Sequence, residues 1–456
     1  MTRTRVTFIC TDCGNDTPRW QGQCPACQGW NTLVEDKVSR QPRSSAKSLA
    51  SPRPRVEVVR IADVEGAASA RWRSGIDEFD FVLGGGVVPG SVVLVGGEPG
   101  LGKTAPIVKF AARIVGSGKS TLYVSGEESA MQVRLRADRL EESSTADVQI
   151  LPETDLSSIL ERVAALQPDL LLIDSIQTVY ASDLEGVPGS VSQVRECAAR
   201  LQRWAKEEGT TVFLVGHVTK AGGIAGPKTL EHIVDTVLYF ERAGDVDHRV
   251  LRATKNRFGG VDEIGVFRMT AAGLLPVSNP SELFLGDRVS HGSGCAVTSI
   301  VEGSRPLLVE IQALAARASY GAAQRVSSGF DQKRLALLLA VLEKRASLPL
   351  GQLDVFLNVV GGLRIIETAV DAAVAAALIS TVRDTPISSD TIVLGEIGLG
   401  GELRPVGQLE RRLAEAARMG FTRALVPRRN AGAGEKPPLR VTEIPNVAAL
   451  LEQLFV

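Results

Sequence analysis

Short apolar runs alternate with longer amphipathic segments between about residues 61 and 277. The runs are rich in Val, Ile and Leu and are bounded by glycine and polar residues, as expected for buried parallel strands. The pattern predicts a helix over 107–115 and strands at 91–95, 121–125, 148–151, 169–174, 211–215 and 235–241. This alternation predicts an α/β fold, with a mainly parallel sheet covered by helices on both faces.

The pattern changes after a break at 278–280, where Ser, Asn and Pro follow one another. Beyond the break, the periodicity predicts an apolar helix at 335–342, a strand at 353–360 and a helix of small residues at 368–380. Such a mixed order is typical of an α+β domain. We therefore expect a core domain over 61–280 and a C-terminal domain over 281–456.

Composition defines the class of protein but no specific partner. Of the 456 residues, 44% are hydrophobic and 23% are charged, which is typical of a soluble globular protein with several domains. The chain starts without an apolar signal region, and its most apolar stretch, 370–379, is too short to cross a bilayer. We therefore expect a cytoplasmic protein with no membrane partner. The net charge is −1, so nucleic-acid binding requires a local basic patch, and residues 1–60 carry ten Lys or Arg against five Asp or Glu.

Two CxxC pairs lie near the N-terminus and consist of Cys10, Cys13, Cys24 and Cys27. Two such pairs on a short hairpin can hold one Zn²⁺ tetrahedrally, and a module this small needs the metal to fold. Two disulfides or a redox-active CxxC are the alternatives, which a reducing cytoplasm and the doubled pair disfavour. We predict a C4 zinc finger over 1–35. Trp20 and Trp30 are expected to cover its core, with base stacking as the alternative.

Residues 36–60 are rich in Ser, Pro and Arg and poor in large apolar residues. This composition is typical of a flexible linker. Its basic charge could contact nucleic acid, but a solvated tether is the preferred interpretation.

A phosphate-binding motif follows the first predicted strand of the core. It fits G-x-x-x-x-G-K-[ST] and consists of Gly97, Glu98, Pro99, Gly100, Leu101, Gly102, Lys103 and Thr104. The glycines let backbone N–H groups converge on phosphate oxygens, and the next helix adds its positive N-terminal end. Lys103 is expected to contact the β- and γ-phosphates of ATP, and Thr104 to ligate Mg²⁺. Pro106 lies in the first helical turn, where proline is tolerated, so we expect nucleotide binding to persist.

Polar residues stand at the ends of three other predicted strands, where ligand sites of parallel sheets lie. Asp174 follows the motif by about seventy residues and is expected to hold the hydration shell of Mg²⁺. Glu127 is the preferred candidate for activating the attacking water, with a helix-capping glutamate as the alternative. His217 is placed to sense the γ-phosphate. The loop at 219–228, which contains two lysines, either contacts a DNA backbone or is a plain connection.

The segment Lys255-Asn256-Arg257-Phe258-Gly259 resembles the KNRFG motif of the RadA (Sms) family of bacterial DNA repair proteins. The cysteine pairs, the phosphate-binding motif and the segments 74–77 and 84–86 match this family too, so the similarity covers nearly the whole chain. The resemblance implies a RecA-like core and a homo-oligomeric ring, a hexamer, on single-stranded DNA. It implies ATP-driven branch migration of branched recombination intermediates beside a RecA-type recombinase, as part of the stress response to DNA damage. It also implies that Lys255 and Arg257 act on a neighbouring subunit's nucleotide, where a cation stabilises the transferring phosphoryl group.

The C-terminal domain resembles the proteolytic domain of Lon proteases at 367–371 and 395–406. In Lon, a serine nucleophile and a lysine base cleave the peptide. In this chain Ala369 stands at the serine position and Arg412 at the lysine position. Alanine has no nucleophilic atom, and arginine stays protonated near neutral pH. We expect a proteolytically inactive platform for assembly and DNA binding.

These observations favour a DNA-dependent ATPase and branch-migration helicase of recombinational repair, with ATP, Mg²⁺ and Zn²⁺ as cofactors. An ATP-dependent Lon-type protease is the first alternative, which Ala369 and Arg412 oppose. A nucleotide-regulated RecA-like assembly or signalling protein without motor activity is the second. ATP hydrolysis with and without single-stranded DNA separates a motor from a scaffold, and casein degradation tests the protease.

Overall fold

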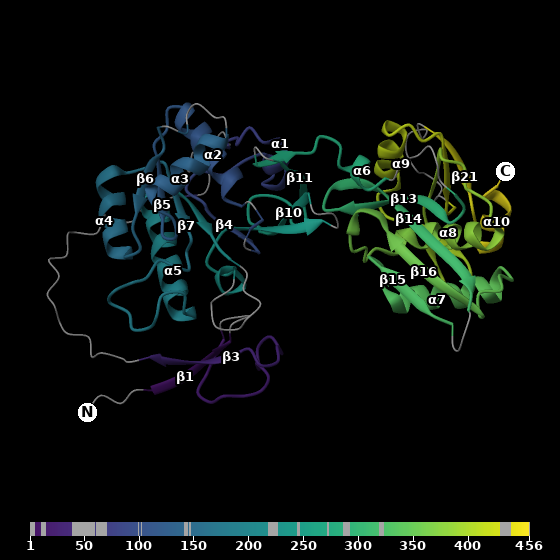
Figure 1. The fold of residues 1–456 in the computed structure, drawn as a ribbon, viewed down its shortest axis with the longest axis horizontal. Coiled ribbons are helices and arrows are strands. Elements are labelled where there is room, and N and C mark those ends of the chain that lie inside the picture. The colour runs from purple at the N-terminus through teal and green to yellow at the C-terminus, as the bar shows by residue number, and fades with distance from the viewer. Residues whose placement is uncertain are drawn as a thin grey trace. The chain divides into compact units, whose positions relative to one another are not determined.

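The structure of the chain is a computed structural model (Figure 1). It describes residues 5–10, 15–38, 60, 71–98, 100–101, 103–140, 145, 147–217, 227–243, 247–270, 273–285, 292–318, 323–428 and 439–455. The chain folds into two compact units, one of Met1–Glu241 with Arg249–Pro276 and one of Arg242–His248 with Val277–Val456. Within the described ranges, no helix combines the length and apolar character needed to cross a membrane.

The chain begins with a three-stranded antiparallel sheet in which β1 lies between its two partners. The strands are β1 (Arg5–Cys10), β2 (Asp16–Thr17) and β3 (Leu33–Val38). Val38 pairs with Arg5, so β3 includes the first three residues of the predicted linker. That part of the linker prediction was wrong, because β1 is long enough to pair with these residues. Residues 39–59 lie outside the described part of the chain.

A nine-stranded sheet forms the core of the first unit, in the order β12-β11-β10-β9-β4-β8-β7-β5-β6. Its strands are β4 (Val92–Gly97), β5 (Thr121–Ser125), β6 (Gln149–Pro152), β7 (Leu170–Asp174), β8 (Thr211–Val215), β9 (Thr236–Ala243), β10 (His248–Asn256), β11 (Ile264–Thr270) and β12 (Gly273–Pro276). From β9 through β6 every neighbouring pair is parallel, whereas β11 and β12 are antiparallel. The six strands predicted from the apolar runs are these six parallel strands, which confirms that prediction.

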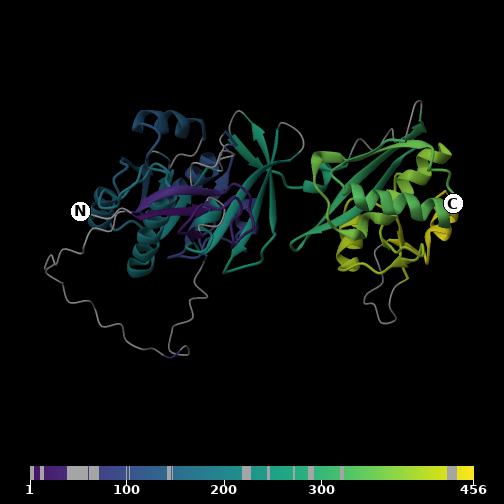
Figure 2. The ribbon, with the colours of Figure 1, turned by 90° about the horizontal axis from the view of Figure 1, so that it is seen from below.

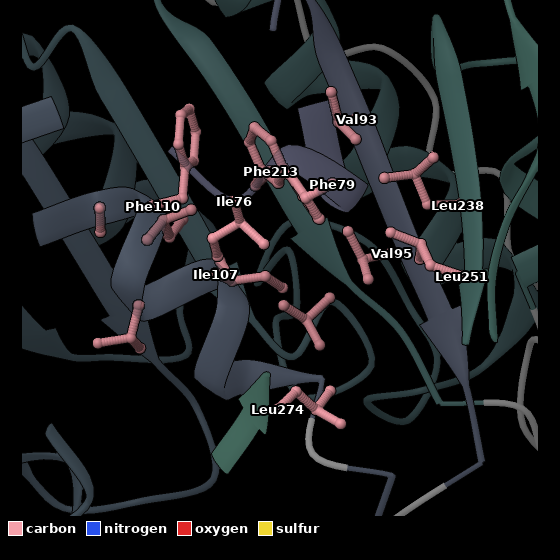
Figure 3. Close-up of a cluster of buried hydrophobic side chains, with 14 of the residues drawn as sticks. Ile76, Phe79, Val93, Val95, Ile107, Phe110, Phe213, Leu238, Leu251 and Leu274 are labelled. Carbon is pink, nitrogen blue, oxygen red and sulfur yellow. The ribbon is translucent and has the colours of Figure 1, made fainter. Parts of the chain in front are cut away.

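Helices cover both faces of this sheet. They are α1 (Asp77–Val82), α2 (Thr104–Gly116), α3 (Ala130–Ala137), α4 (Leu156–Leu166) and α5 (Val191–Glu208). Because side chains alternate along a strand, Val93 and Val95 of β4 pack in one cluster with α1, α2 and α3, and the intervening residues of β4 pack with α4 and α5. At the centre of the first cluster, the rings of Phe79, Phe110 and Phe213 lie with centroids 5.3 to 6.5 Å apart (Figure 3).

The second unit is built on a seven-stranded mixed sheet in the order β15-β16-β14-β13-β17-β20-β21. Its strands are β13 (Cys295–Glu302), β14 (Arg305–Arg317), β15 (Arg325–Ser328), β16 (Leu353–Val359), β17 (Thr391–Val393), β20 (Arg423–Val426) and β21 (Arg440–Glu443), with a separate pair of β18 (Glu396–Ile397) and β19 (Leu403–Arg404). Its helices are α6 (Pro280–Leu283), α7 (Gln332–Arg345), α8 (Asp371–Arg383), α9 (Leu409–Arg418) and α10 (Val447–Gln453).

The α+β prediction for this unit is confirmed. Parallel and antiparallel pairs share the sheet, and α8 packs against β13, β14 and β17. Figure 2 shows the strands and helices of this unit in green and yellow. The predicted helix at 335–342 is α7, the predicted strand at 353–360 is β16, and the small-residue helix is α8, preceded by a 3-10 turn at Thr368–Val370. The small side chains of α8 allow its first ten residues, 371–380, to lie buried.

Candidate functional site

A cavity of about 410 Å³ lies where β5, β7 and β8 end and α2 begins. The residues described around it are Gly100, Leu101, Lys103, Thr104, Ala105, Ser125, Glu127, Glu128, Arg136, Asp174 and His217. The structure therefore brings together five polar residues that the sequence predicted for one site, namely Lys103, Thr104, Glu127, Asp174 and His217. Pro99 and Gly102 of the motif lie outside the described residues. A cavity of this size is within the range of small-molecule sites.

The ammonium group of Lys103 reaches into the cavity from a side chain that is almost entirely buried. Its Nζ donates hydrogen bonds to the backbone carbonyls of Gly97 and Glu98 and lies 2.9 Å from Nδ1 of His217. Burial lowers the pKa of Lys103 to about 8, and the carboxylates of Asp174 and Glu127 oppose this shift. A phosphate group would therefore meet a cation that is already desolvated and would stabilise its charged form.

Thr104 and Asp174 meet across the cavity. Thr104 Oγ1, at the start of α2, donates a hydrogen bond of 3.1 Å to Asp174 Oδ2 at the end of β7. The Tyr123 hydroxyl donates a second bond of 2.6 Å to the same oxygen from a buried position on β5. Mg²⁺ prefers oxygen ligands such as these, so the pair fits the predicted metal. Sequence analysis missed Tyr123, because a tyrosine inside an apolar strand looks like a packing residue.

Glu127 is held by two side chains from neighbouring strand ends. The buried Ser175 donates a hydrogen bond of 2.5 Å to Glu127 Oε1, and Nε2 of His217 lies 3.2 Å from the same oxygen. His217 therefore stands between Glu127 and Lys103, with one ring nitrogen toward each. A carboxylate fixed in this way can orient a water molecule. The sequence contains one signal for Ser175, which is its position directly after Asp174.

Arg136 on α3 adds a cation to the wall of the cavity. It forms an ion pair with Glu128, the residue after Glu127. The helix begins at a capping box made by Ser129 and Gln132. Sequence analysis found no signal for Arg136, because several arginines follow one another on this helix and their pattern alone indicates only a solvated face.

Pro106 does not interrupt α2. It is the third residue of the helix and is buried in the apolar face. A proline here costs nothing in backbone hydrogen bonding, because the first N–H groups of a helix have no intrahelical acceptor.

The KNRFG motif, residues 255–259, is absent from the described lining of this cavity. Lys255 Nζ donates hydrogen bonds to the backbone carbonyls of Glu231 and Val234, the latter at 2.8 Å. Burial and then the charge of Arg257 lower the pKa of Lys255. Arg257 is different, because its side chain is 51% exposed and its NH1 lies 3.5 Å from Oδ1 of Asp235. The Arg257 side chain is therefore less constrained by its contacts than the Lys255 side chain.

The rest of the motif packs against the glycine segment 84–86. Asn256 donates a hydrogen bond of 3.3 Å to the carbonyl of Leu83 and accepts one of 3.0 Å from the Phe258 N–H. A Cβ atom on Gly259 would lie 3.4 Å from the Cα of Gly84 and 2.8 Å from Nδ2 of Asn256, so a side chain there would displace the Asn256 amide. The structure thus brings together the segments 84–86 and 255–259, which lie far apart in the sequence and both resemble the family.

Three of the four predicted zinc ligands converge. The Sγ atoms of Cys10, Cys24 and Cys27 all lie within 4.8 Å of one another, and those of Cys10 and Cys27 are 3.6 Å apart. Sulfur atoms bound tetrahedrally at about 2.3 Å from one zinc are roughly 3.8 Å apart, so these thiols fit such a centre. Cys13 lies outside the described residues.

The expectation that two tryptophans cover this metal core was wrong. Trp20 is 57% exposed and Trp30 is 71% exposed. Leu33 and the partly buried Phe8 pack against the cysteines instead. A ribbon of three short strands has too little interior to enclose two indole rings as well.

In the Lon-like domain, both substituted positions are buried. Ala369 is 3% exposed and Arg412 is 2% exposed. The Arg412 guanidinium pairs with Glu367 and donates to the backbone carbonyls of Ser299 and Gly407. Arg412 therefore fastens α9 to the segment just before Ala369.

Family models match three parts of the chain. A rubredoxin metal binding domain matches residues 8–35, an AAA domain matches 80–223, and the Lon protease (S16) C-terminal proteolytic domain matches 368–451. These matches agree with the zinc ribbon, the ATPase core and the Lon-like domain expected from the sequence.

Curated relatives match along nearly their whole length. DNA repair protein RadA of Bacillus subtilis is 45% identical over 99% of both chains, and that of Pseudomonas aeruginosa is 46% identical over 100% of both. The protein of the same name from Synechocystis sp. is 45% identical over 95% of this chain and 91% of its own. A solved KaiC-like protein from Pyrococcus horikoshii aligns with 46% of this chain and 99% of its own, at 24% identity and a TM-score of 0.38. The sequence relatives show that this chain belongs to the RadA family of bacterial DNA repair proteins.

Proposed function

We propose that this protein is a DNA-stimulated ATP hydrolase that promotes branch migration of recombination intermediates during DNA repair in the cytoplasm. The convergence of Lys103, Thr104, Asp174 and Glu127 at one end of the parallel sheet carries the ATPase part of the proposal. Membership of the RadA family supports the repair part. His217 supports the link to DNA, because it lines the cavity and lies two residues before the predicted DNA-contacting loop at 219–228.

Each proposed role follows from a contact. Lys103 exchanges its bonds to the Gly97 and Glu98 carbonyls for oxygens of the β- and γ-phosphates. Thr104 would hold Mg²⁺ and Asp174 its hydration shell, and the ion would supply positive charge next to the phosphate oxygens. The rest of the motif, from Gly97 to Gly102, supplies backbone donors to the phosphates.

The attacking water is assigned to Glu127. This carboxylate accepts a hydrogen bond from the water and takes its proton, while Ser175 keeps the carboxylate in place. His217 contacts both Glu127 and Lys103, so the arrival of a γ-phosphate next to Lys103 changes the surroundings of its ring. We propose that His217 is the sensor of the γ-phosphate.

Arg257 is proposed to act on the nucleotide of a neighbouring subunit, with Lys255 as the second cation of that site. The half-exposed Arg257 side chain supports this role. The proposal requires a homo-oligomeric ring, a hexamer, on single-stranded DNA, with a RecA-type recombinase as partner. Residues 1–38 are proposed as the zinc finger, 39–60 as a linker, 61–280 as the ATPase domain and 281–456 as an inactive Lon-like platform for assembly and DNA.

Mixed subunits test the proposal directly. Arg257→Ala lacks the acting cation and Lys103→Ala lacks its own phosphate contact, so each variant alone should lose turnover. In mixed rings, an intact Lys103 in one subunit meets an intact Arg257 from the next, and part of the DNA-stimulated activity should return. Arg203→Ala, at an exposed position of α5, is the control that should keep full activity. No recovery where mixed rings demonstrably form would contradict the assignment.

A further inference from the structure

Asp235 connects Arg257 to the strand that leads into the phosphate-binding motif. Its side chain is 7% exposed. Oδ2 accepts a hydrogen bond of 3.0 Å from the backbone N–H of Val92, and Oδ1 lies 3.5 Å from NH1 of Arg257. The backbone of Asp235 makes the same two connections, because its N–H donates to the Val92 carbonyl at 2.9 Å and its carbonyl accepts from the Arg257 N–H at 3.1 Å.

Val92 is the first residue of β4, and β4 ends at Gly97. The Gly97 carbonyl accepts a hydrogen bond from Lys103. β4 is a buried strand paired on both sides, so it links the phosphate-binding motif to Val92, which bonds the backbone N–H and Oδ2 of Asp235.

The predicted DNA-contacting loop, 219–228, ends shortly before Asp235 in the chain. A 3-10 turn at Pro227–Leu230 is followed by Glu231 and Val234, whose carbonyls accept hydrogen bonds from Lys255. Asp235 is the next residue. Residues 231–235 therefore follow the end of that loop and contact both the cations of the KNRFG motif and the start of β4.

The two attachments of Asp235 differ in strength. Its bonds to Val92 are buried and double, whereas its ion pair with Arg257 is long and half exposed to solvent. Exposed ion pairs contribute little net free energy. The guanidinium can therefore leave the carboxylate for a phosphate while Asp235 keeps its hydrogen bonds to Val92 of β4.

We propose that Asp235 is a positioning residue that holds Arg257 ready for the neighbouring subunit and couples it to the nucleotide site of its own subunit. The inference rests on the proposed trans-acting role of Arg257. Asp235 itself touches no nucleotide in this account, and it acts through Arg257.

Asp235→Asn separates the two attachments. The amide oxygen can still accept from the Val92 N–H, while the amide nitrogen that then faces Arg257 cannot accept a hydrogen bond from it. We expect the variant to bind a fluorescent ATP analogue normally and to lose on the order of tenfold in DNA-stimulated turnover, as a misplaced reacting group does. Asp183→Asn is the matched control, because it breaks a surface pair with Arg200 at 2.8 Å on another element. It should change turnover by less than about twofold.

Mixing distinguishes positioning of Arg257 from damage to the variant's own site. Lys103→Ala subunits are inactive but offer an intact Arg257 to their neighbours. Added to Asp235→Asn subunits, they should raise turnover per intact phosphate-binding motif several-fold above that of Asp235→Asn alone. If turnover per motif does not rise, Asp235 acts only within its own subunit and the inference is overturned.

The parallel mixture of Arg257→Ala with Lys103→Ala keeps the two proposals apart. Recovery there without recovery for Asp235→Asn defeats the inference alone, whereas no recovery in either defeats the trans-acting role itself. The double variant Asp235→Asn/Arg257→Ala should be no less active than Arg257→Ala, because both changes remove the same contribution; a further loss contradicts the inference. If Asp235→Asn lowers the thermal unfolding midpoint, all three measurements are made at a temperature at which circular dichroism shows the variant to be folded.

Discussion

Thr104 Oγ1 and Asp174 Oδ2, from residues 70 positions apart in the chain, lie 3.1 Å from each other. One residue begins α2 and the other ends β7, and the two elements meet only because β7 lies in the same parallel sheet as β4. The contact places a hydroxyl and a carboxylate, the two oxygen types that suit Mg²⁺, beside the ammonium group of Lys103. The position of this pair is the structural basis of the proposed ATPase.

Thr104→Val should abolish DNA-stimulated ATP hydrolysis. Valine has nearly the same shape but no oxygen for Mg²⁺ or for Asp174, so the loss reflects chemistry rather than packing. Thr104→Ser keeps the hydroxyl and should retain at least about a third of wild-type turnover, a loss of under about 0.7 kcal/mol in transition-state stabilisation. Phosphate release at several magnesium concentrations measures both variants. Equal activity of the valine and serine variants would contradict the role of the hydroxyl.

The sequence was sufficient to predict the six parallel strands of the core, because each is a short apolar run that ends at a glycine or polar residue. It also predicted the five residues Lys103, Thr104, Glu127, Asp174 and His217 as one site, because carboxyl ends of parallel strands share one edge. Strands β10 and β11 were not predicted, since their sequences mix charged and apolar residues without a clear period, and β12 was not predicted because it has only four residues.

The missed residues support the site from within the fold. Tyr123, Ser175 and Asp235 each donate or accept a hydrogen bond across strands, and such pairs depend on strand order and register, which no local pattern encodes. The wrong prediction for Trp20 and Trp30 has a related cause, because a large aromatic residue predicts burial only where the domain has an interior to receive it.

Nucleotide affinity should fall as the pH rises above about 8. In the free protein, burial holds the pKa of Lys103 at about 8. Bound phosphates favour the ammonium form and raise this pKa, so binding takes up a proton above pH 8 and none well below it. Affinity for ADP should then be constant below pH 8 and fall by up to about tenfold per pH unit above it.

Calorimetry at pH 7 and pH 9, in two buffers of different ionisation enthalpy, measures the affinity and the proton uptake together. Lys206→Ala, an exposed lysine on α5, should show the same dependence as the wild type. Lys103→Arg should remove the proton uptake, since arginine stays charged. Equal affinity at both pH values with no proton uptake would rule out a neutral Lys103 in the free protein.

The N-terminal ribbon should bind one zinc ion per chain. Cys24→Ser removes a converging thiolate and should lower the zinc content severalfold and unfold the ribbon, because the metal supplies much of its folding free energy. Cys295→Ala, a half-buried thiol in the other unit, should keep the full zinc content. Elemental analysis of freshly purified protein measures the zinc content per chain. Less than about half an equivalent of zinc in the wild type would count against the site.

The Lon-like domain should show no peptidase activity, even with a nucleophile restored. Ala369→Ser supplies a hydroxyl, but the buried Arg412 is paired with Glu367 and cannot act as a base. Casein should therefore stay intact with ATP for the wild type and for this variant. ATP-dependent cleavage by the wild type that disappears when residues 281–456 are deleted would overturn the assignment.

DNA-stimulated ATP hydrolysis is the most direct test of the whole account. Turnover should rise severalfold when single-stranded DNA is added to the wild-type protein, and Lys103→Ala should abolish it, because no other described residue places an ammonium group in the cavity. Lys206→Ala should behave like the wild type. Undiminished DNA-stimulated turnover in Lys103→Ala, or no turnover by the wild type with ATP, Mg²⁺ and DNA present, would contradict the proposed function.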